Sequence, residues 1–308
     1  MEETFDVIIL GAGAAGLTAG IYTSRAKLST LILNEGAIGG QMTLTNEIAN
    51  YPGVHTTSGY ALATTMKEQA KSFGCKIKSN VSISSYDLES DIKTIQLANG
   101  QVFKGKTIII AAGGVPRTLP IPGEEQFRGK GISFCATCDG EFFTDKEVVV
   151  VGGGNSALEE AVSLSKHARK ITIVHQFDHF QAFKHAIQDA ESNPKINFVM
   201  QSELREFRGN LNLESVLVEH LPTGEKQEIK TDGVFLFIGY TPKTDAFKEI
   251  LPLNSRGEIP VDAEMKTSID GVFAAGDCIA KRYRQVTTSV AEGTIAALSV
   301  AEYLNKKN

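Results

Sequence analysis

The chain has 308 residues, of which 42% are hydrophobic and 22% charged, and its formal net charge is -5. This composition suits a globular protein with room for two domains, and it lacks the basic surplus that binds nucleic acids or anionic membranes. The start of the chain is acidic, and no apolar run approaches the roughly 20 residues that span a bilayer, so we expect a cytoplasmic protein without nucleic-acid or membrane partners.

The first predicted element is a buried strand that ends in a glycine turn. Residues 6–17 read Asp-Val-Ile-Ile-Leu-Gly-Ala-Gly-Ala-Ala-Gly-Leu, an apolar run followed by Gly-x-Gly-x-x-Gly. Such a turn lets a pyrophosphate approach the backbone, and the helix behind it offers N–H groups and a favourable dipole. A single copy is weak evidence, because glycine turns are common.

Short alternating segments follow, and they predict small antiparallel strands around the hairpin signal Asn99-Gly100. These segments are residues 77–81, 82–88, 94–97 and 102–103. A buried strand within residues 107–113 then ends in glycine, and Pro116 stops regular structure.

Two cysteines, Cys135 and Cys138, are separated by two residues and followed by Asp139. Such a pair can close an exchangeable disulfide, and a neighbouring carboxyl can move the protons of the thiols. Half of a zinc site is the competing interpretation, but it needs a second close Cys/His pair, and Cys75 and Cys278 lack that spacing. The pattern favours a redox-active pair and no metal site.

The layout of the first strand recurs 141 positions later. Residues 147–158 read Glu-Val-Val-Val-Val-Gly-Gly-Gly-Asn-Ser-Ala-Leu, again a buried strand, a glycine turn and a helix start. The duplication predicts an α/β fold of two Rossmann-like dinucleotide-binding domains, three-layered and with small antiparallel β-meanders. The second domain, residues 118–245, is expected to be inserted in the first, which comprises residues 1–117 and 246–308.

Cys-Ala-Thr-Cys-Asp between two dinucleotide folds resembles the low-molecular-weight thioredoxin reductases. The resemblance covers essentially the whole chain, through the landmarks Gly39-Gly-Gln41, Asn50-Tyr-Pro-Gly53, Ala111-Ala-Gly113, residues 271–278 and Arg284-Gln-Val286. It implies a homodimeric flavoprotein that holds FAD in the first domain. Electrons would pass from FAD to Cys138, and Cys135 would then attack the disulfide of a thioredoxin-like protein.

The resemblance also implies a set of FAD contacts. Glycines of the first turn would cradle the pyrophosphate, Glu35 or Asn34 would read a ribose, and Asp277 would bind the ribityl chain. The full set is Gly11, Gly13, Ala14, Gly16, Asn34, Glu35, Gly39, Gly40, Gln41, Asn50, Ala111, Gly113, Gly276, Asp277, Arg284, Gln285 and Val286. Cys75 and Cys278 are expected to be inert.

The chain departs from the family after its second glycine turn. There the family has His-Arg-Arg-x-x-x-Arg, whose guanidinium groups bind the 2′-phosphate of NADPH, whereas residues 175–181 read His-Gln-Phe-Asp-His-Phe-Gln. Each such contact contributes about 1.5–3 kcal/mol, so their joint loss removes several powers of ten in affinity. The sequence therefore disfavours NADPH and predicts a weak or vestigial nucleotide turn at Gly152, Gly154, Asn155 and Ser156.

Three electron donors stay open. Reduced ferredoxin is favoured, because clostridial-type relatives that use it resemble this chain in losing the arginines. NADH is the second candidate, although the strand end lacks the ribose-binding carboxylate and Asp178 lies three residues further along. Ordinary NADPH use would need Gln176, Gln181, Lys184 or Lys170 to replace the guanidinium groups.

Other functions share parts of these motifs. The flavoprotein subunit of a peroxide-reducing system carries an additional N-terminal domain, whereas only five residues precede the first strand here. Thioredoxin-reductase-like ferredoxin–NADP reductases lack the Cys-x-x-Cys pair. A non-catalytic flavin-binding or redox-sensor protein does not require an intact Cys-x-x-Cys-Asp. The sequence favours a disulfide reductase over these three.

Overall fold

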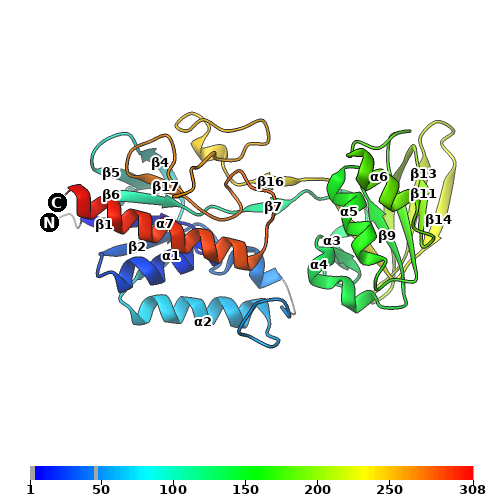
Figure 1. The fold of residues 1–308 in the computed structure, drawn as a ribbon, viewed down its shortest axis with the longest axis horizontal. Helices are drawn as coiled ribbons and strands as arrows, with labels where there is room; N and C mark the ends of the chain where they lie inside the picture. Colours follow the sequence, from blue (N-terminus) through cyan, green and yellow to red (C-terminus); the bar gives the residue numbers. More distant parts are fainter. Residues whose placement is uncertain (1–3, 45–47, 308) are drawn as a thin grey trace. The chain divides into compact units, whose positions relative to one another are not determined.

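The computed structural model describes residues 4–44 and 48–307, and the chain divides into two compact units (Figure 1). Unit 1 comprises Met1–Val115 and Thr241–Asn308, and unit 2 comprises Pro116–Tyr240. The first three residues of the acidic N-terminal segment lie outside the described residues. Within the described ranges, every helix is too short or too polar to cross a bilayer.

Unit 1 is built on a seven-stranded sheet of order β3-β2-β1-β6-β5-β4, with β17 also paired to β6. Its parallel strands are β1 (Thr4–Leu10), β2 (Thr30–Asn34), β3 (Lys76–Ser79) and β17 (Val272–Ala274), and its antiparallel meander consists of β4 (Ile83–Asp87), β5 (Lys93–Leu97) and β6 (Val102–Ile110). β6 belongs to both parts, because it also runs parallel to β1.

One strand prediction is wrong. The segment predicted at residues 77–81 is not antiparallel: it forms β3, a parallel edge strand paired with β2. Residues 102–103 are also no separate strand but the start of β6. An edge strand with one solvated face shows the same alternating pattern in either direction, so the pattern alone did not reveal how β3 runs.

Three helices cover one face of this sheet: α1 (Ala14–Arg25), α2 (Gly59–Ser72) and α7 (Val286–Lys307) (Figure 1). Side chains of β1 alternate between two cores, because successive residues of a strand point to opposite faces. Val7 and Ile9 pack in the core that contains the helices, whereas Ile8 and Leu10 pack with β5 and the segment around residues 247–279. Short 3₁₀ turns occupy Gly40–Leu44 and Asp245–Phe247.

Unit 2 repeats this plan on a parallel five-stranded sheet of order β11-β10-β9-β15-β8. The sheet strands are β8 (Ile132–Ser133), β9 (Glu147–Val151), β10 (Lys170–Val174), β11 (Ile196–Val199) and β15 (Gly233–Leu236). The helical segments are α3 (Glu124–Phe127), α4 (Ala136–Asp139), the 3₁₀ turn Gly140–Phe143, α5 (Asn155–Leu164) and α6 (Lys184–Glu191). An antiparallel sheet of β12 (Ser202–Gly209), β13 (Leu213–His220) and β14 (Lys226–Lys230) completes the unit.

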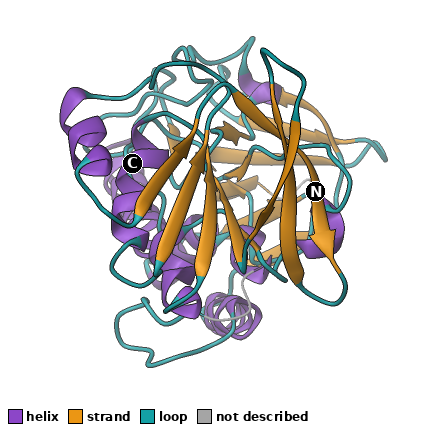
Figure 2. Ribbon diagram, turned by 90° about the vertical axis from the view of Figure 1, so that its right-hand side faces the viewer, coloured by secondary structure: helices purple, strands orange, loops and turns teal. Residues whose placement is uncertain are grey.

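The two cores of unit 2 lie on opposite faces of its parallel sheet. Val148 and Val150 pack with α5 and α6, and Val149 and Val151 pack with the antiparallel sheet. Figure 2 shows the strands, in orange, fanning out with the twist expected of sheets. The predicted α/β class with two Rossmann-like domains is confirmed.

The two connections between the units pair with each other. They form a two-stranded sheet of β7 (Gly114–Pro116) and β16 (Tyr240–Pro242). A glycine with positive φ precedes each strand, Gly113 at 66° and Gly239 at 117°.

α1 and α7 approach so closely that a glycine is required between them. A Cβ atom added to Gly293 of α7 would lie 2.3 Å from the Ala15 carbonyl oxygen of α1. Because that oxygen belongs to the backbone, the contact is relieved only by moving a helix.

We expect Gly293→Ala to destabilise the protein by about 1–3 kcal/mol, because overpacking outweighs the roughly 1 kcal/mol that alanine adds to helix propensity. Urea unfolding followed by circular dichroism measures the change. Gly36→Ala is the matched control, since no described atom lies within 4 Å of its added Cβ. Equal stability of the two variants would contradict the close packing of α1 and α7.

Candidate functional site

The glycine turn after β1 contains two kinds of glycine. Gly11, at φ 112°, and Gly16 are required by the fold: added Cβ atoms would lie 2.2 Å from the Ala111 oxygen and 2.0 Å from the Gly11 oxygen. Gly13 is different, because no described atom lies within 4 Å of its added Cβ and its φ is -82°. The described protein atoms thus leave space beside Gly13, and packing alone does not require glycine there.

The segment after β2 is tied to this turn. The Ala12 N–H donates to Asn34 Oδ1 at 2.9 Å, and the Gly39 N–H donates to the Ala12 oxygen at 2.8 Å. Gly40 faces Gly13, with its added Cβ 3.5 Å from the Gly13 Cα. Asn34 therefore holds the turn itself. The carboxylate of Glu35 points elsewhere and accepts the Ile83 N–H at 3.2 Å.

A partly buried charge network fixes Asp277 on the other side of the turn. Lys281 lies 2.9 Å from Asp277 Oδ1 and 2.8 Å from Glu292 Oε2, and Ser289 donates to Asp277 at 3.2 Å. Burial raises the pKa of Glu292 and Lys281 lowers it, while the Gly276 N–H also donates to its carboxyl. Sequence reasoning missed Glu292 and the pairing of Lys281 with Asp277, for which the four-residue spacing was the available signal.

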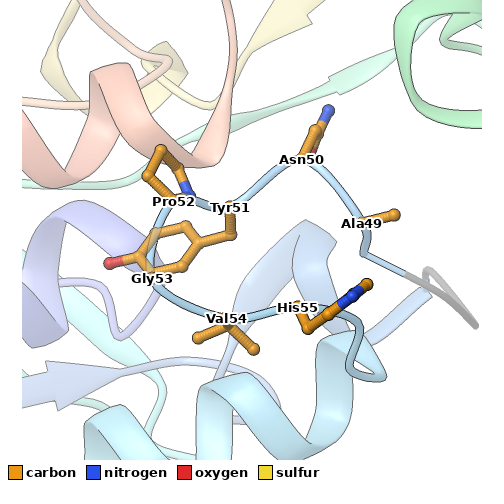
Figure 3. Close-up of a pocket in the computed structure, with 7 residues that line it drawn as sticks. All are labelled: Ala49, Asn50, Tyr51, Pro52, Gly53, Val54 and His55. Atoms are coloured by element: carbon orange, nitrogen blue, oxygen red, sulfur yellow. The ribbon is translucent and has the colours of Figure 1, made fainter.

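Asn50 and Gln285, separated by 235 positions, meet through Nδ2 and Oε1 at 3.5 Å. Residues 49–55 line a hollow of about 520 Å³, and Figure 3 shows the Asn50 side chain at the outer edge of this loop with the Tyr51 ring turned across it. Val286 begins α7 directly beyond Gln285. Arg284 instead pairs with the buried carboxylate of Glu258.

The glycine turn and the predicted contacts Asn34, Ala111, Gly113, Gly276 and Asp277 thus lie at the carboxyl ends of β1, β2, β6 and β17, where Rossmann-like sheets bind dinucleotides. α1 begins at Ala14 without a side-chain cap, so its N-terminal N–H groups suit a phosphate. The space at Gly13 and the fixed Asp277 carboxylate suit a pyrophosphate and a hydroxylated chain. These residues fit FAD.

The redox pair lies in unit 2. Cys135 and Cys138 form a disulfide with an S–S distance of 2.10 Å and a Cα–Cα distance of 5.3 Å. Cys135 is the N-cap of the short helix α4, which contains Cys138, and the Cys138 N–H donates to Cys135 Sγ at 3.2 Å. The same N–H would stabilise a Cys135 thiolate after the disulfide opens.

Two carboxyls accompany the pair. Burial raises the pKa of Asp139, and a hydrogen bond from Ser133 lowers it; the Ser133 hydroxyl donates to Asp139 Oδ2 at 2.6 Å. Burial also raises the pKa of Glu160 on α5, as does the neighbouring Glu159, while the Thr137 N–H lowers it. Sequence reasoning missed Ser133 and Glu160, because neither residue type nor spacing marks them.

The remaining cysteines are isolated from this chemistry. Cys75 and Cys278 are buried and free, and burial raises the pKa of each thiol to about 11. Their thiolates are therefore rare at neutral pH. In the described part of the chain, no group of three or more His, Cys, Asp or Glu side chains is arranged to hold a metal ion.

The second glycine turn is in contact with the segment that follows β10. An added Cβ on Gly153 would meet the ring of buried His175 at 2.4 Å. The Gln181 N–H donates to the Gly153 oxygen at 2.8 Å, and the Phe183 N–H donates to Asn155 Oδ1 at 2.7 Å. Ser156, one residue further, is exposed. The Asn155 side-chain oxygen thus already accepts a hydrogen bond from within the protein.

The family's arginine positions hold an aromatic and acidic surface here. His175 stacks on Phe180 and meets Phe177 edge-on, with centroids 5.8 and 5.4 Å apart. Asp178 pairs with His179 at 2.6 Å, which lowers the pKa of Asp178 and keeps it anionic.

Of the two lysines considered as replacements, only one lies near this surface. Lys170 begins β10, roughly 15 Å from residue 175 at the rise of a strand, and pairs with Glu147 at 3.6 Å. Lys184 begins α6 and is exposed. Lys184 is thus the one lysine close in sequence to the positions where the family has three arginines.

Residues 5–293 match the family described as pyridine nucleotide-disulphide oxidoreductase. The chain belongs to this family. It is 44% identical to the thioredoxin reductase of Peptoclostridium acidaminophilum, over 99% of this chain and 98% of the relative. It is 45% identical, over 99% of both chains, to a Clostridium pasteurianum protein described as "34.2 kDa protein in rubredoxin operon".

The solved thioredoxin reductase of Streptococcus pyogenes superposes with a TM-score of 0.93 at 39% identity, over 99% of this chain and all of the other. Within the family, the chain is therefore an FAD-dependent disulfide oxidoreductase of the thioredoxin reductase type. The predicted resemblance and enzyme class are confirmed at this level.

We expect Gly13→Ala to weaken FAD binding at least about tenfold, because the added methyl group occupies the space left for the pyrophosphate. The unfolding midpoint of the FAD-free protein should stay unchanged, since the methyl group meets no described atom. Titration of FAD-free protein with FAD measures the affinity. Unchanged affinity would show that the pyrophosphate does not approach Gly13.

Proposed function

We propose that this chain reduces the disulfide of a thioredoxin-like protein, with electrons that pass through FAD and the Cys135–Cys138 pair. The observation that carries the proposal is the joint presence of the FAD-fitting turn in unit 1 and the Cys-Ala-Thr-Cys-Asp disulfide in unit 2. The thioredoxin reductases among its relatives support the same substrate class. A homodimer, a cytoplasmic location and the domain limits 1–117, 118–245 and 246–308 are part of this proposal.

We further propose that reduced ferredoxin, rather than NADPH, is the electron donor. Gln176, Phe177 and Gln181 offer no guanidinium group to a 2′-phosphate, and anionic Asp178 repels one. Lys184 is the single lysine or arginine within residues 175–185. A single exposed lysine does not replace three bidentate contacts.

NADH is the second candidate, and its site is also incomplete. The residue that should accept the ribose hydroxyls is His175, whose buried ring packs on Gly153 and whose Nε2 lies 3.1 Å from the His179 oxygen. A one-electron iron protein needs no such pocket. The relative described from a rubredoxin operon supports a donor of this kind, since rubredoxin is also a one-electron iron protein.

Bound FAD would accept electrons from the donor and pass them to the disulfide. The Cys135 thiolate, stabilised by the Cys138 N–H, then attacks the partner disulfide, and the leaving partner sulfur takes a proton from Asp139. Cys138 next attacks Cys135, which restores the intramolecular disulfide and releases the second partner sulfur. The Cys138 proton passes to Asp139, so protons and electrons balance.

Gly113 and Gly239 are the proposed hinges of the cycle. In the family, one domain rotates against the other, so that the cysteine pair meets first flavin and then thioredoxin. Both glycines have positive φ and directly precede the paired connections β7 and β16. Glycine absorbs the dihedral changes that such a motion requires.

We expect reduced ferredoxin to bleach the visible absorption of the oxidised flavin rapidly under anaerobic conditions, and micromolar NADPH or NADH to do so slowly. Two further thiols should then become titratable, and oxidised thioredoxin should be reduced. Rapid bleaching by NADPH would overturn the ferredoxin proposal and return the chain to ordinary NADPH use. Bleaching without new thiols would identify a non-catalytic flavoprotein.

We expect the triple change Gln176→Arg, Phe177→Arg and Gln181→Arg to raise NADPH affinity at least about a hundredfold, because it restores charge-assisted contacts. The apparent Kd for bleaching measures the gain. Gln176→Asn, Phe177→Leu and Gln181→Asn form the matched neutral control. Because NADH lacks the 2′-phosphate, its affinity should not rise; equal gains for both nucleotides would contradict the argument.

A further inference from the structure

Ser133 is a buried hydroxyl beside the redox pair, only 5% exposed. It ends β8, and its backbone is held in place by the pairing of β8 with β15. Its Oγ donates to Asp139 Oδ2 at 2.6 Å and accepts the Cys135 N–H at 3.2 Å. One side chain of the sheet thus joins both ends of the Cys-Ala-Thr-Cys-Asp turn.

The serine hydroxyl has one proton, so it can donate fully to only one of the two nearby acceptors. The Cys135 oxygen lies 3.4 Å away, farther than Asp139 Oδ2, and it already accepts the Asp139 N–H at 3.1 Å. A charged acceptor also makes the stronger hydrogen bond. The hydroxyl proton therefore goes to Asp139.

Other titratable groups near α4 act less directly. They are Glu159 and Glu160 on α5, His167 just beyond α5, and Glu141 in the 3₁₀ turn. The causes that shift the pKa of Asp139 are burial, which raises it, and the Ser133 hydrogen bond, which lowers it. Ser133 is thus the side chain through which the fold acts on this carboxyl.

We propose that Ser133 is a positioning residue of the disulfide exchange, holding the Asp139 carboxyl and the Cys135 backbone as one hydrogen-bonded unit. The inference rests on the proposed function. Opening the disulfide removes the covalent link between positions 135 and 138, but both Ser133 contacts span residues 133–139 without using a sulfur atom. Asp139 therefore stays beside the sulfurs while it protonates the leaving sulfur of the partner and afterwards takes up the Cys138 proton.

The direction in which Ser133→Ala shifts the pKa of Asp139 is predictable. Asp139 stays buried but loses the donor that stabilises its ionised form, so its pKa rises further. The limb of the pH–rate profile that reports Asp139 should move up by about one pH unit, as expected for one hydrogen bond to a charged group. Ser133→Thr retains a hydroxyl and should restore the wild-type profile.

The experiment uses the FAD-loaded full chain, reduced with stoichiometric dithionite, so it needs no natural electron donor. Stopped-flow mixing with oxidised thioredoxin between pH 5 and pH 9 gives the rate of the exchange step. Ser215→Ala is the matched control, because Ser215 is also buried and donates to a carboxylate, Glu228, but lies on β13 of another sheet. Circular dichroism and FAD content show whether each variant is folded.

A shifted limb in Ser133→Ala, with wild-type profiles in Ser133→Thr and Ser215→Ala, supports the proposal. An unshifted limb in Ser133→Ala, or an equal shift in Ser133→Thr, overturns it. Asp139→Asn should abolish the limb, and adding Ser133→Ala to it should change nothing further; additive effects also overturn the proposal. A wild-type protein that reduces no thioredoxin at any pH refutes the proposed function itself.

Discussion

A close approach between backbones, with no room for a side chain, organises both halves of this molecule. In unit 1 the position of a Gly11 Cβ is taken by the Ala111 oxygen, and in unit 2 that of Gly152 is taken by the Phe237 oxygen. In both units the chain leaves a strand, β1 or β9, passes the end of the neighbouring strand, β6 or β15, and enters a helix. The glycine pattern repeats in the sequence because this steric constraint occurs in both units.

This constraint explains why Gly152 and Gly153 say little about nucleotide use. Gly152 must stay glycine to pass Phe237, and Gly153 must stay glycine to pack on His175, whether or not a nucleotide ever binds. By contrast, nothing in the fold required arginine at positions 176, 177 and 181, where exposed neutral side chains now stand. Gly152 and Gly153 are therefore no evidence of nucleotide use, whereas Gly154 resembles Gly13, because the nearest printed atom to its added Cβ is the Gln181 oxygen at 3.9 Å.

The sequence predicted features whose cause is local. Glycine turns, apolar strands and Cys-x-x-Cys each depend on a few adjacent residues, so the fold class and redox pair were accessible. Ser133, Glu160 and Glu292 were not, because ordinary residue types acquire their roles only when distant elements pack together. The predicted direction of β3 was wrong for a related reason. A strand runs parallel or antiparallel according to the strand with which it pairs, here β2, and its own residue pattern does not show this.

The burial of Cys75 and Cys278 confines sulfur chemistry to one place. A thiol with a pKa of about 11 is ionised in roughly one molecule in ten thousand at pH 7, and both sulfurs are also shielded from solvent. Neither thiol competes for the disulfide that Cys135 and Cys138 exchange with a partner. Mixed disulfides with Cys75 or Cys278 are therefore disfavoured at neutral pH.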